Sequence, residues 1–303
     1  MNYKIIYFIC TALLTSNLLA CSPKNSSVSQ ENINKTENTI TQKAPITKAT
    51  RVVALTPFAA DVIYHLDKTK LVGIPNGRYT DEVAKTKFAD FPRVGRNTAI
   101  NLEKIVALKP DLVIGAEGFH DKILSRLTEL GIPTLQRSIR SWQDLETQTK
   151  ELATLISSDP NPILNQLRAN LNNIPENGQR VLVLLRTQPT SSPNKNSWAG
   201  DLLTKFNFKN MAADLPGSGR FPGYLTLSQE KILAANPDKI FLIESASLNP
   251  KDFKKLPYWK QLKAVQNNQV YIFHHDGLIS PTSISTVEEV TQKLREVALK
   301  SSK

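Results

Sequence analysis

The sequence predicts an α/β protein built from two related lobes, and an internal repeat is the main reason. Residues 103–111 read EKIVALKPD and residues 230–238 read EKILAANPD, with six identical positions at one fixed offset. In each copy a proline ends a short helix, and an apolar run typical of a buried parallel strand follows it. Because the segment recurs once, half a chain away, it indicates a duplicated domain rather than a solenoid of short repeats.

Length and composition agree with two lobes, and a disulfide scaffold is excluded because Cys10 lies in the leader and leaves Cys21 as a single cysteine. The chain has 303 residues and is 40% hydrophobic, enough to fill two cores. Its formal net charge is +11, but the basic residues are dispersed, so we expect no nucleic-acid partner. A solvated surface accounts for the charge, and attraction to an anionic ligand or to lipid headgroups is the alternative.

The first fifty residues predict export and membrane anchoring. Residues 1–20 form a basic and then apolar leader that is too short for a membrane span and is typical of a signal peptide. It ends in Leu-Leu-Ala before Cys21, the pattern of a bacterial lipoprotein signal, so we expect Cys21 to be acylated. A plain signal peptide with a coincidental cysteine is the alternative. Residues 21–50 are mostly Ser, Asn, Thr and Lys and predict a flexible tether.

Strands and helices alternate through the predicted first lobe, residues 51–157. Strands are expected at 51–55, 71–74, 112–115 and 132–135, with Thr56 and Pro57 starting the first helix. The polar loop 75–80 follows a strand, where open α/β sheets bind ligands.

A connecting helix is predicted over residues 158–176, because Asp159 and Pro160 are typical of a helix start and Pro175 stops it. The second lobe, residues 177–303, repeats the alternation. Strands are expected at 180–185, 239–243 and 270–273, and helices at 199–206, 256–265 and 282–299. The predicted fold class is therefore two Rossmann-like α/β lobes joined by a single long connecting helix, with a ligand cleft between them.

With its lipoprotein signal and tether, this organisation resembles the substrate-binding proteins of bacterial ABC importers. The resemblance narrows to the class that binds ferric siderophores, haem or cobalamin. RVVALTPFAADVIYHL, LVGI and RVGRNTAINLEKIVALKPDLVIGA are similar to that class's first lobe, and LSQEKILAANPDKIFLI and WKQLKAVQNNQVYIF to its second. The resemblance implies a membrane-anchored monomer that delivers a small chelate to a dimeric permease with its ATPase.

Two residues match the positions at which this class docks on its permease. Glu103 and Glu230 fall at the same place in the two copies of the repeat. Carboxylates on matching elements of two lobes suit a dimeric, positively charged partner. The alternative is stabilisation of each helix, since Glu in a first turn complements the helix dipole.

The ligand-binding candidates are arginine, aromatic and polar residues of the predicted strand-end loops. Guanidinium groups bind carboxylate or hydroxamate oxygens in a two-pronged manner, and aromatic rings cover apolar faces. In the class resembled, Tyr224 lies where cobalamin-binding members place an aromatic, and Arg96 lies one residue from an arginine of some hydroxamate-binding members. The candidates are Phe58, Tyr79, Arg96, Asn97, Phe119, Arg186, Trp198, Arg220, Tyr224 and His275.

A ferric siderophore is the ligand that these residues favour, with haem and cobalamin as alternatives. Haem would need an axial Tyr or His, for which Tyr79, Tyr224, His120 and His275 are available. A directly bound metal ion would need several converging His and carboxylates, and the chain has only four His. We expect no protein-bound metal and no cofactor.

Other classes of protein fit the sequence less well. An exported hydrolase would need a nucleophilic Ser on a strand-turn-helix, and Gly217-Ser218-Gly219 follows no predicted strand. An adhesion lipoprotein would have no reason to carry matched glutamates on two lobes. We therefore expect a binding protein and not an enzyme.

Overall fold

The computed structural model describes residues 48–96, 99–217 and 223–300, which belong to one compact unit. The predicted signal peptide, Cys21 and most of the tether lie outside the described residues, as do Asn97 and Arg220. The tether was expected to reach residue 50, but Ala49 is fully buried and its N–H donates to Leu155 O at 2.6 Å. The folded body therefore begins earlier than the composition suggested.

Two four-stranded parallel sheets form the centres of the two lobes. The first has the order β2 (Leu71–Gly73), β1 (Val52–Ala54), β5 (Leu112–Ala116) and β6 (Thr134–Arg137). The second has the order β9 (Lys209–Asn210), β7 (Arg180–Leu184), β11 (Lys239–Glu244) and β12 (Val270–His274). In each sheet the strand that follows the repeat pairs with the first long strand of its lobe, so the two sheets have equivalent topology.

Helices and short ribbons complete the lobes. Two antiparallel ribbons join β3 (Gly95–Arg96) to β4 (Ala99–Ile100) and β8 (Ser191–Pro193) to β10 (Tyr224–Thr226). The α-helices are α1 (Pro57–Asp67), α2 (Leu102–Ala107), α3 (Asp121–Glu129), α4 (Trp142–Leu155), α5 (Asn161–Arg168), α6 (Trp198–Lys205), α7 (Gln229–Ala235), α8 (Lys263–Gln266), α9 (His275–Leu278) and α10 (Ile284–Lys300). The shorter turns are η1 (Lys68–Lys70), η2 (Tyr79–Val83), η3 (Ala169–Leu171), η4 (Pro250–Lys255) and η5 (Trp259–Gln261).

The repeat folds in the same way in both lobes. Asn101 and Ser228 cap α2 and α7 through their side chains, and Ile105 and Ile232 are the buried residues of the two helices. The residue before each proline, Lys109 or Asn236, adopts a left-handed conformation, with φ of 48° and 35°. That conformation turns the chain from the helix into the strand.

The aspartate that closes each repeat fastens the first strand of its lobe. The Asp111 carboxylate accepts from the N–H groups of Thr50 and Arg51 at 2.8 and 2.9 Å. Asp238 accepts from the N–H of Arg180 at 3.0 Å and from Lys263 Nζ at 2.9 Å. The two identical aspartates thus have a structural role that explains their recurrence.

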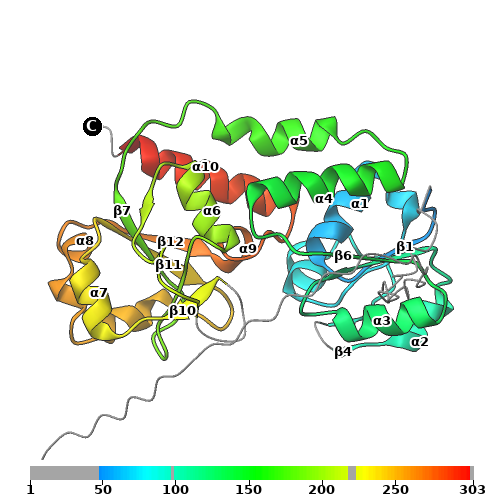
Figure 1. Cartoon of the computed structure of the whole chain (residues 1–303), viewed down its shortest axis with the longest axis horizontal. Helices are drawn as coiled ribbons and strands as arrows, with labels where there is room; N and C mark the ends of the chain where they lie inside the picture. Colours follow the sequence, from blue (N-terminus) through cyan, green and yellow to red (C-terminus); the bar gives the residue numbers. More distant parts are fainter. Residues whose placement is uncertain (1–47, 97–98, 218–222, 301–303) are drawn as a thin grey trace, which may run out of the picture. The chain divides into compact units, whose positions relative to one another are not determined.

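The connection between the sheets is two helices rather than a single long one. A break at Ser157, which has a φ of 59°, separates α4 from α5. The helix expected over 158–176 is confined to Asn161–Arg168, and the 3₁₀ turn η3 extends it by three residues. Figure 1 shows α5 and α10 together along the upper side of the body, and Gln166 of α5 donates to Glu288 of α10 at 2.8 Å.

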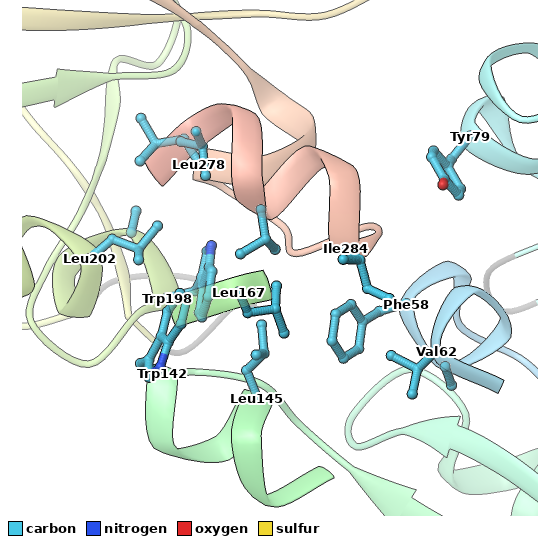
Figure 2. Packing of buried hydrophobic residues seen from close by; sticks show 14 of the residues in the cluster. Phe58, Val62, Tyr79, Trp142, Leu145, Leu167, Trp198, Leu202, Leu278 and Ile284 are labelled. Atoms are coloured by element: carbon cyan, nitrogen blue, oxygen red, sulfur yellow. The ribbon is translucent and has the colours of Figure 1, made fainter. Parts of the chain in front are cut away.

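Two pairs of helices, α1 with α10 and α4 with α6, make contacts between the lobes, which we call the crossed contacts. Helix α1 of the first lobe contacts α10 of the second, and α6 of the second contacts α4 of the first. Figure 2 shows Phe58 of α1 next to Ile284 of α10, and Trp142 of α4 beside Trp198 of α6. The two indole rings stack with centroids 6.0 Å apart. A continuous hydrophobic cluster therefore runs from one lobe into the other.

Candidate functional site

The candidate site lies where chain segments leave the carboxyl ends of strands in both sheets. Arg78 follows β2 in the first lobe, while Arg186 follows β7 and His275 follows β12 in the second. Ligands of open α/β sheets bind at this edge of the strands.

An ion pair joins the two lobes at this place. The guanidinium of Arg78 contacts the carboxylate of Asp276, with 39% of the Arg78 side chain and 17% of the Asp276 side chain exposed. The Arg78 side chain is therefore partly accessible to solvent, whereas Asp276 is largely covered. Sequence reasoning singled out the loop 75–80 but missed Arg78 itself, although a basic residue in a strand-end loop was a usable signal.

Positive charge from both lobes acts on His275. Burial lowers the pKa of His275, and the charges of Arg78 and Arg186 lower it further. The imidazole is therefore neutral near pH 7 and available as a hydrogen-bond partner. Its Nδ1 lies 3.6 Å from the Asp276 carboxylate. Two guanidinium groups, one carboxylate and one neutral imidazole thus make up the charged centre of the candidate site.

A tight turn fixes the backbone beside Asp276. Gly277 has a φ of +106°, and a Cβ at this position would lie 2.5 Å from Thr286 O, so only glycine fits. The N–H of Gly277 donates to Ser280 O at 2.7 Å, and its carbonyl accepts from Trp198 Nε1 at 2.6 Å. The Asp276 carboxylate is consequently presented from a rigid segment.

Three predicted ligand residues face the protein core instead of a cleft. Phe58 and Trp198 are each 2% exposed and Tyr79 is 5% exposed. The Tyr79 hydroxyl donates to Asp61 at 2.9 Å, and its pKa is raised by burial and by the Asp61 charge. All three side chains pack between the lobes, where they are not accessible to a ligand.

The other predicted residues differ in accessibility. Arg96, Phe119 and Arg186 are exposed, and His275 is half-buried. Tyr224 is partly buried, its hydroxyl donates to Ile279 O at 3.2 Å, and burial raises its pKa. Of the predicted ligand residues that the structure describes, Arg186 and His275 are the two that the charged centre brings together.

Most of the proposed axial ligands for haem are committed elsewhere. Nδ1 of the buried His120 accepts from the N–H of Ala116 at 2.9 Å. Tyr79 and Tyr224 donate to protein oxygens, and their raised pKa values disfavour the phenolate that would ligate iron. Within the described parts of the chain no three His, Cys, Asp or Glu side chains converge to hold a metal ion.

Two open hollows lie at the carboxyl ends of strands, one in each lobe. The first-lobe hollow, of about 600 Å³, is lined by Glu117, Asp121, Gln136, Arg137, Ser138, Arg140 and Asp144. The second-lobe hollow, of about 450 Å³, is lined by Glu244–Asp252 except Pro250. Neither hollow takes residues from both lobes, and none of the predicted ligand residues lines either one.

The two repeat glutamates occupy equivalent, exposed positions. Glu103 lies in the first turn of α2 and Glu230 in the first turn of α7. Figure 1 shows both helices on the lower side of the body, away from α5 and α10. A hydrogen bond from Ser228 lowers the pKa of Glu230, so this carboxylate is charged at neutral pH.

No helix in the described ranges is long and apolar enough to cross a bilayer.

Two topologically equivalent α/β lobes with charged strand-end loops define a two-lobed solute-binding protein. Residues 52–276 match the family described as "Periplasmic binding protein", and the chain belongs to that family. It is 28% identical over 237 residues to the Fe(3+)-citrate-binding protein YfmC of Bacillus subtilis, covering 73% of this chain and 72% of that protein. It is 26% identical over 268 residues to the vitamin B12-binding protein of Vibrio cholerae, covering 82% and 90%.

Solved structures give the same result. The periplasmic vitamin B12 binding protein BtuF of Vibrio cholerae superposes with a TM-score of 0.61 at 25% identity, over 83% of this chain and 98% of that one. The periplasmic heme-binding protein RhuT from Roseiflexus sp. RS-1 has the same fold, with a TM-score of 0.66 at 18% identity over 84% and 100%. The resemblance predicted from the sequence and the two-lobed α/β fold class are thereby confirmed.

Proposed function

We propose that this chain captures an anionic iron chelate, most simply a ferric siderophore or a related ferric carboxylate complex, and delivers it to the permease of an ABC importer. The observation that carries the proposal is that Arg78 and His275, one from each lobe, both lie against the Asp276 carboxylate at the strand ends, where the charge of Arg186 also acts on His275. A relative named as a ferric citrate binder supports the same chemistry.

Each of these side chains suits chelate oxygens. Arg78 and Arg186 carry planar forks of donors that bind carboxylate, hydroxamate or catecholate oxygens in bidentate fashion. His275, neutral near pH 7, adds a hydrogen bond without adding charge. Arg96 and Phe119, both exposed on the first lobe, are further candidates, and the Phe119 ring would cover an apolar part of the chelate.

Cobalamin is the second candidate ligand, because relatives from Vibrio cholerae and Vibrio vulnificus are named as vitamin B12-binding proteins. Two arginines suit it less well, because a single phosphodiester is its only anionic group and its other polar side chains are uncharged amides. Haem is the third candidate, but its iron would depend on His275, since the two tyrosines are engaged.

The test is a fluorescence titration of the soluble body, starting near Thr47. Trp142 and Trp198 stack between the lobes, and Trp198 bonds to the turn beside Asp276, so their emission should report on the site. Ferric citrate, hydroxamate and catecholate ferric complexes, haemin and cyanocobalamin would be compared. We expect saturable quenching by at least one ferric chelate at micromolar concentration or below.

Charge-removing variants connect that binding to the site. Arg186→Gln should weaken chelate binding at least tenfold, since a charge-assisted hydrogen bond contributes about 1.5–3 kcal/mol. Arg126→Gln, which removes an exposed guanidinium paired with Glu129, is the matched control and should bind like wild type. Tight binding of cobalamin alone, unaffected by Arg186→Gln, would contradict the proposed ligand class.

We also propose that acylated Cys21 holds the body at a membrane. The lipoprotein-type motif supports this, and the relative YvrC of Bacillus subtilis is named as a lipoprotein. Cys21→Ala should move the protein from the membrane to the soluble fraction. Wild-type protein that already fractionates as soluble would refute the anchor while leaving the ligand proposal intact.

A further inference from the structure

We infer that the Asp276 carboxylate pairs with the Arg78 guanidinium while no ligand is bound, and that an acidic group of the incoming chelate replaces Asp276 in this pair. The inference rests on the proposed function, because it assigns Asp276 a role at that same site. Asp276 would then select for ligands that carry an anionic group strong enough to replace a carboxylate.

The contact geometry distinguishes a mobile and a fixed partner in this pair. Arg78 has the longer and more exposed side chain, at 39% against 17% for Asp276. The turn around Gly277 holds Asp276 in place through the Ser280 and Trp198 hydrogen bonds. An exchange of partners therefore requires the guanidinium to turn, while the carboxylate stays where it is.

The backbone of Arg78 is also held, which confines the exchange to its side chain. The neighbouring Tyr79 donates its hydroxyl to the buried Asp61 at 2.9 Å. Asp61 in turn accepts the N–H of Ile284 from the other lobe at 3.0 Å. The guanidinium thus moves between two acceptors from a fixed base, with no need for the lobes to separate.

The charge balance gives the exchange a direction. While Asp276 is paired with Arg78, the group formed by Arg78, Arg186 and Asp276 has a net positive charge of one unit. An acidic ligand that takes over Arg78 faces two guanidinium groups, but it leaves Asp276 partly covered and without its partner. A neutral ligand has no group that replaces the carboxylate. Every ligand that uses Arg78 must therefore break the ion pair, which costs binding free energy. Only an anionic ligand offsets that cost, by forming a new ion pair with Arg78.

The experiment is a double-mutant cycle on chelate affinity, with Asp276→Asn, Arg78→Gln and the double variant. Asp276→Asn should tighten binding of the preferred ferric chelate about 3- to 10-fold, as expected from removal of a partly buried competing ion pair. Arg78→Gln should weaken binding. In the Arg78→Gln background, Asp276→Asn should change affinity by less than about twofold, because no pair remains to be broken.

Two outcomes would overturn the inference. If Asp276→Asn weakens binding, the carboxylate orients Arg78 toward the ligand instead of competing with it. If the gain persists in the Arg78→Gln background, Asp276 acts by direct repulsion of the ligand and not through Arg78. Asp214→Asn, which removes an exposed acid paired with Lys195 in the same lobe, is the charge-matched control and should leave affinity unchanged.

A measurement without ligand separates this inference from the proposed function. The same four proteins, unfolded in urea, should show coupling between positions 78 and 276, and saturating chelate should abolish it. Absence of coupling in the ligand-free protein would refute the ion-pair exchange. Absence of chelate binding by the wild type would refute the proposed function, whatever the coupling.

Discussion

The N–H of Ile284, the first residue of α10, donates to the Asp61 carboxylate on α1 at 3.0 Å. The converse contact joins the other pair of helices. The N–H of Trp142, the first residue of α4, donates to Asp201 on α6 at 2.7 Å. Each lobe therefore supplies an aspartate that satisfies an orphan N–H at the start of the other lobe's long helix.

These two aspartates should differ in their contribution to stability. Asp61 is 1% exposed and also accepts from Tyr79 and Lys87, so Asp61→Asn leaves a partly buried lysine without its charge partner. We expect a loss of about 3–5 kcal/mol in the free energy of unfolding. Asp201→Ala removes a single cap and should cost about 1 kcal/mol. Urea unfolding of both variants checks the order, and equal losses would contradict it.

The crossed contacts predict little movement of the lobes on ligand binding. Wide closure would break both aspartate contacts and separate the stacked Trp142 and Trp198 rings. X-ray scattering profiles recorded with and without saturating chelate should therefore nearly coincide. A decrease in the radius of gyration as large as that of loop-hinged binding proteins would contradict this prediction.

The repeat aspartates should protect the protein against acid. Partial burial opposes the charge of Asp238, but hydrogen bonds from Lys263 and Arg180 outweigh burial and hold its pKa well below 3.8. The stabilisation is present above the ordinary pKa and is lost as the pH falls below about 4. Asp238→Asn should lose about 2 kcal/mol at pH 7 and show a shallower decline in acid. Asp252→Asn, a half-exposed acid paired with Lys255, is the control.

The glutamates of the repeat should be required for transport and not for capture. Ala at both Glu103 and Glu230 should reduce uptake of the chelate by cells at least tenfold, while its affinity in solution stays within about twofold of wild type. The matched control replaces two other exposed acids, Glu129 and Glu176, by Ala and should transport normally. A collapse of affinity in the Glu103 and Glu230 variant would assign these residues to the ligand site.

Mild acid should destabilise the body through His275. Its folded-state pKa lies below 6.5 because of burial and the charges of Arg78 and Arg186. As the pH falls below about 6.5, the unfolded chain takes up a proton that the folded His275 resists, so stability decreases. His275→Gln should flatten this decline between about pH 7 and 5 in urea unfolding. His65, whose pKa burial and Lys87 also lower, contributes in the same direction, so some slope should remain.

The sequence predicted all four strands of the first sheet and three of the second, because the repeat and the apolar runs are local signals, but it missed the two-residue edge strand β9. The sequence also placed Phe58, Tyr79 and Trp198 at the ligand site, because they were assigned to the loops at the ends of strands. Their side chains instead fill the junction between the lobes, which only the crossed packing of distant helices could reveal. The neighbouring residues Arg78 and Tyr79 show the difficulty most clearly. Arg78 pairs with Asp276 at the candidate site, whereas Tyr79 turns into the core and bonds to Asp61.

The exchange of aspartates bears on how the duplicated chain behaves when it is divided. Cut in the segment between α5 and β7, each fragment would carry an acid whose helix is on the other piece, and a helix whose acid is on the other piece. Neither fragment should be stable by itself, although each contains a complete sheet. When the two fragments are mixed, each should bind the other rather than a copy of itself, because only the two different fragments together restore both aspartate contacts.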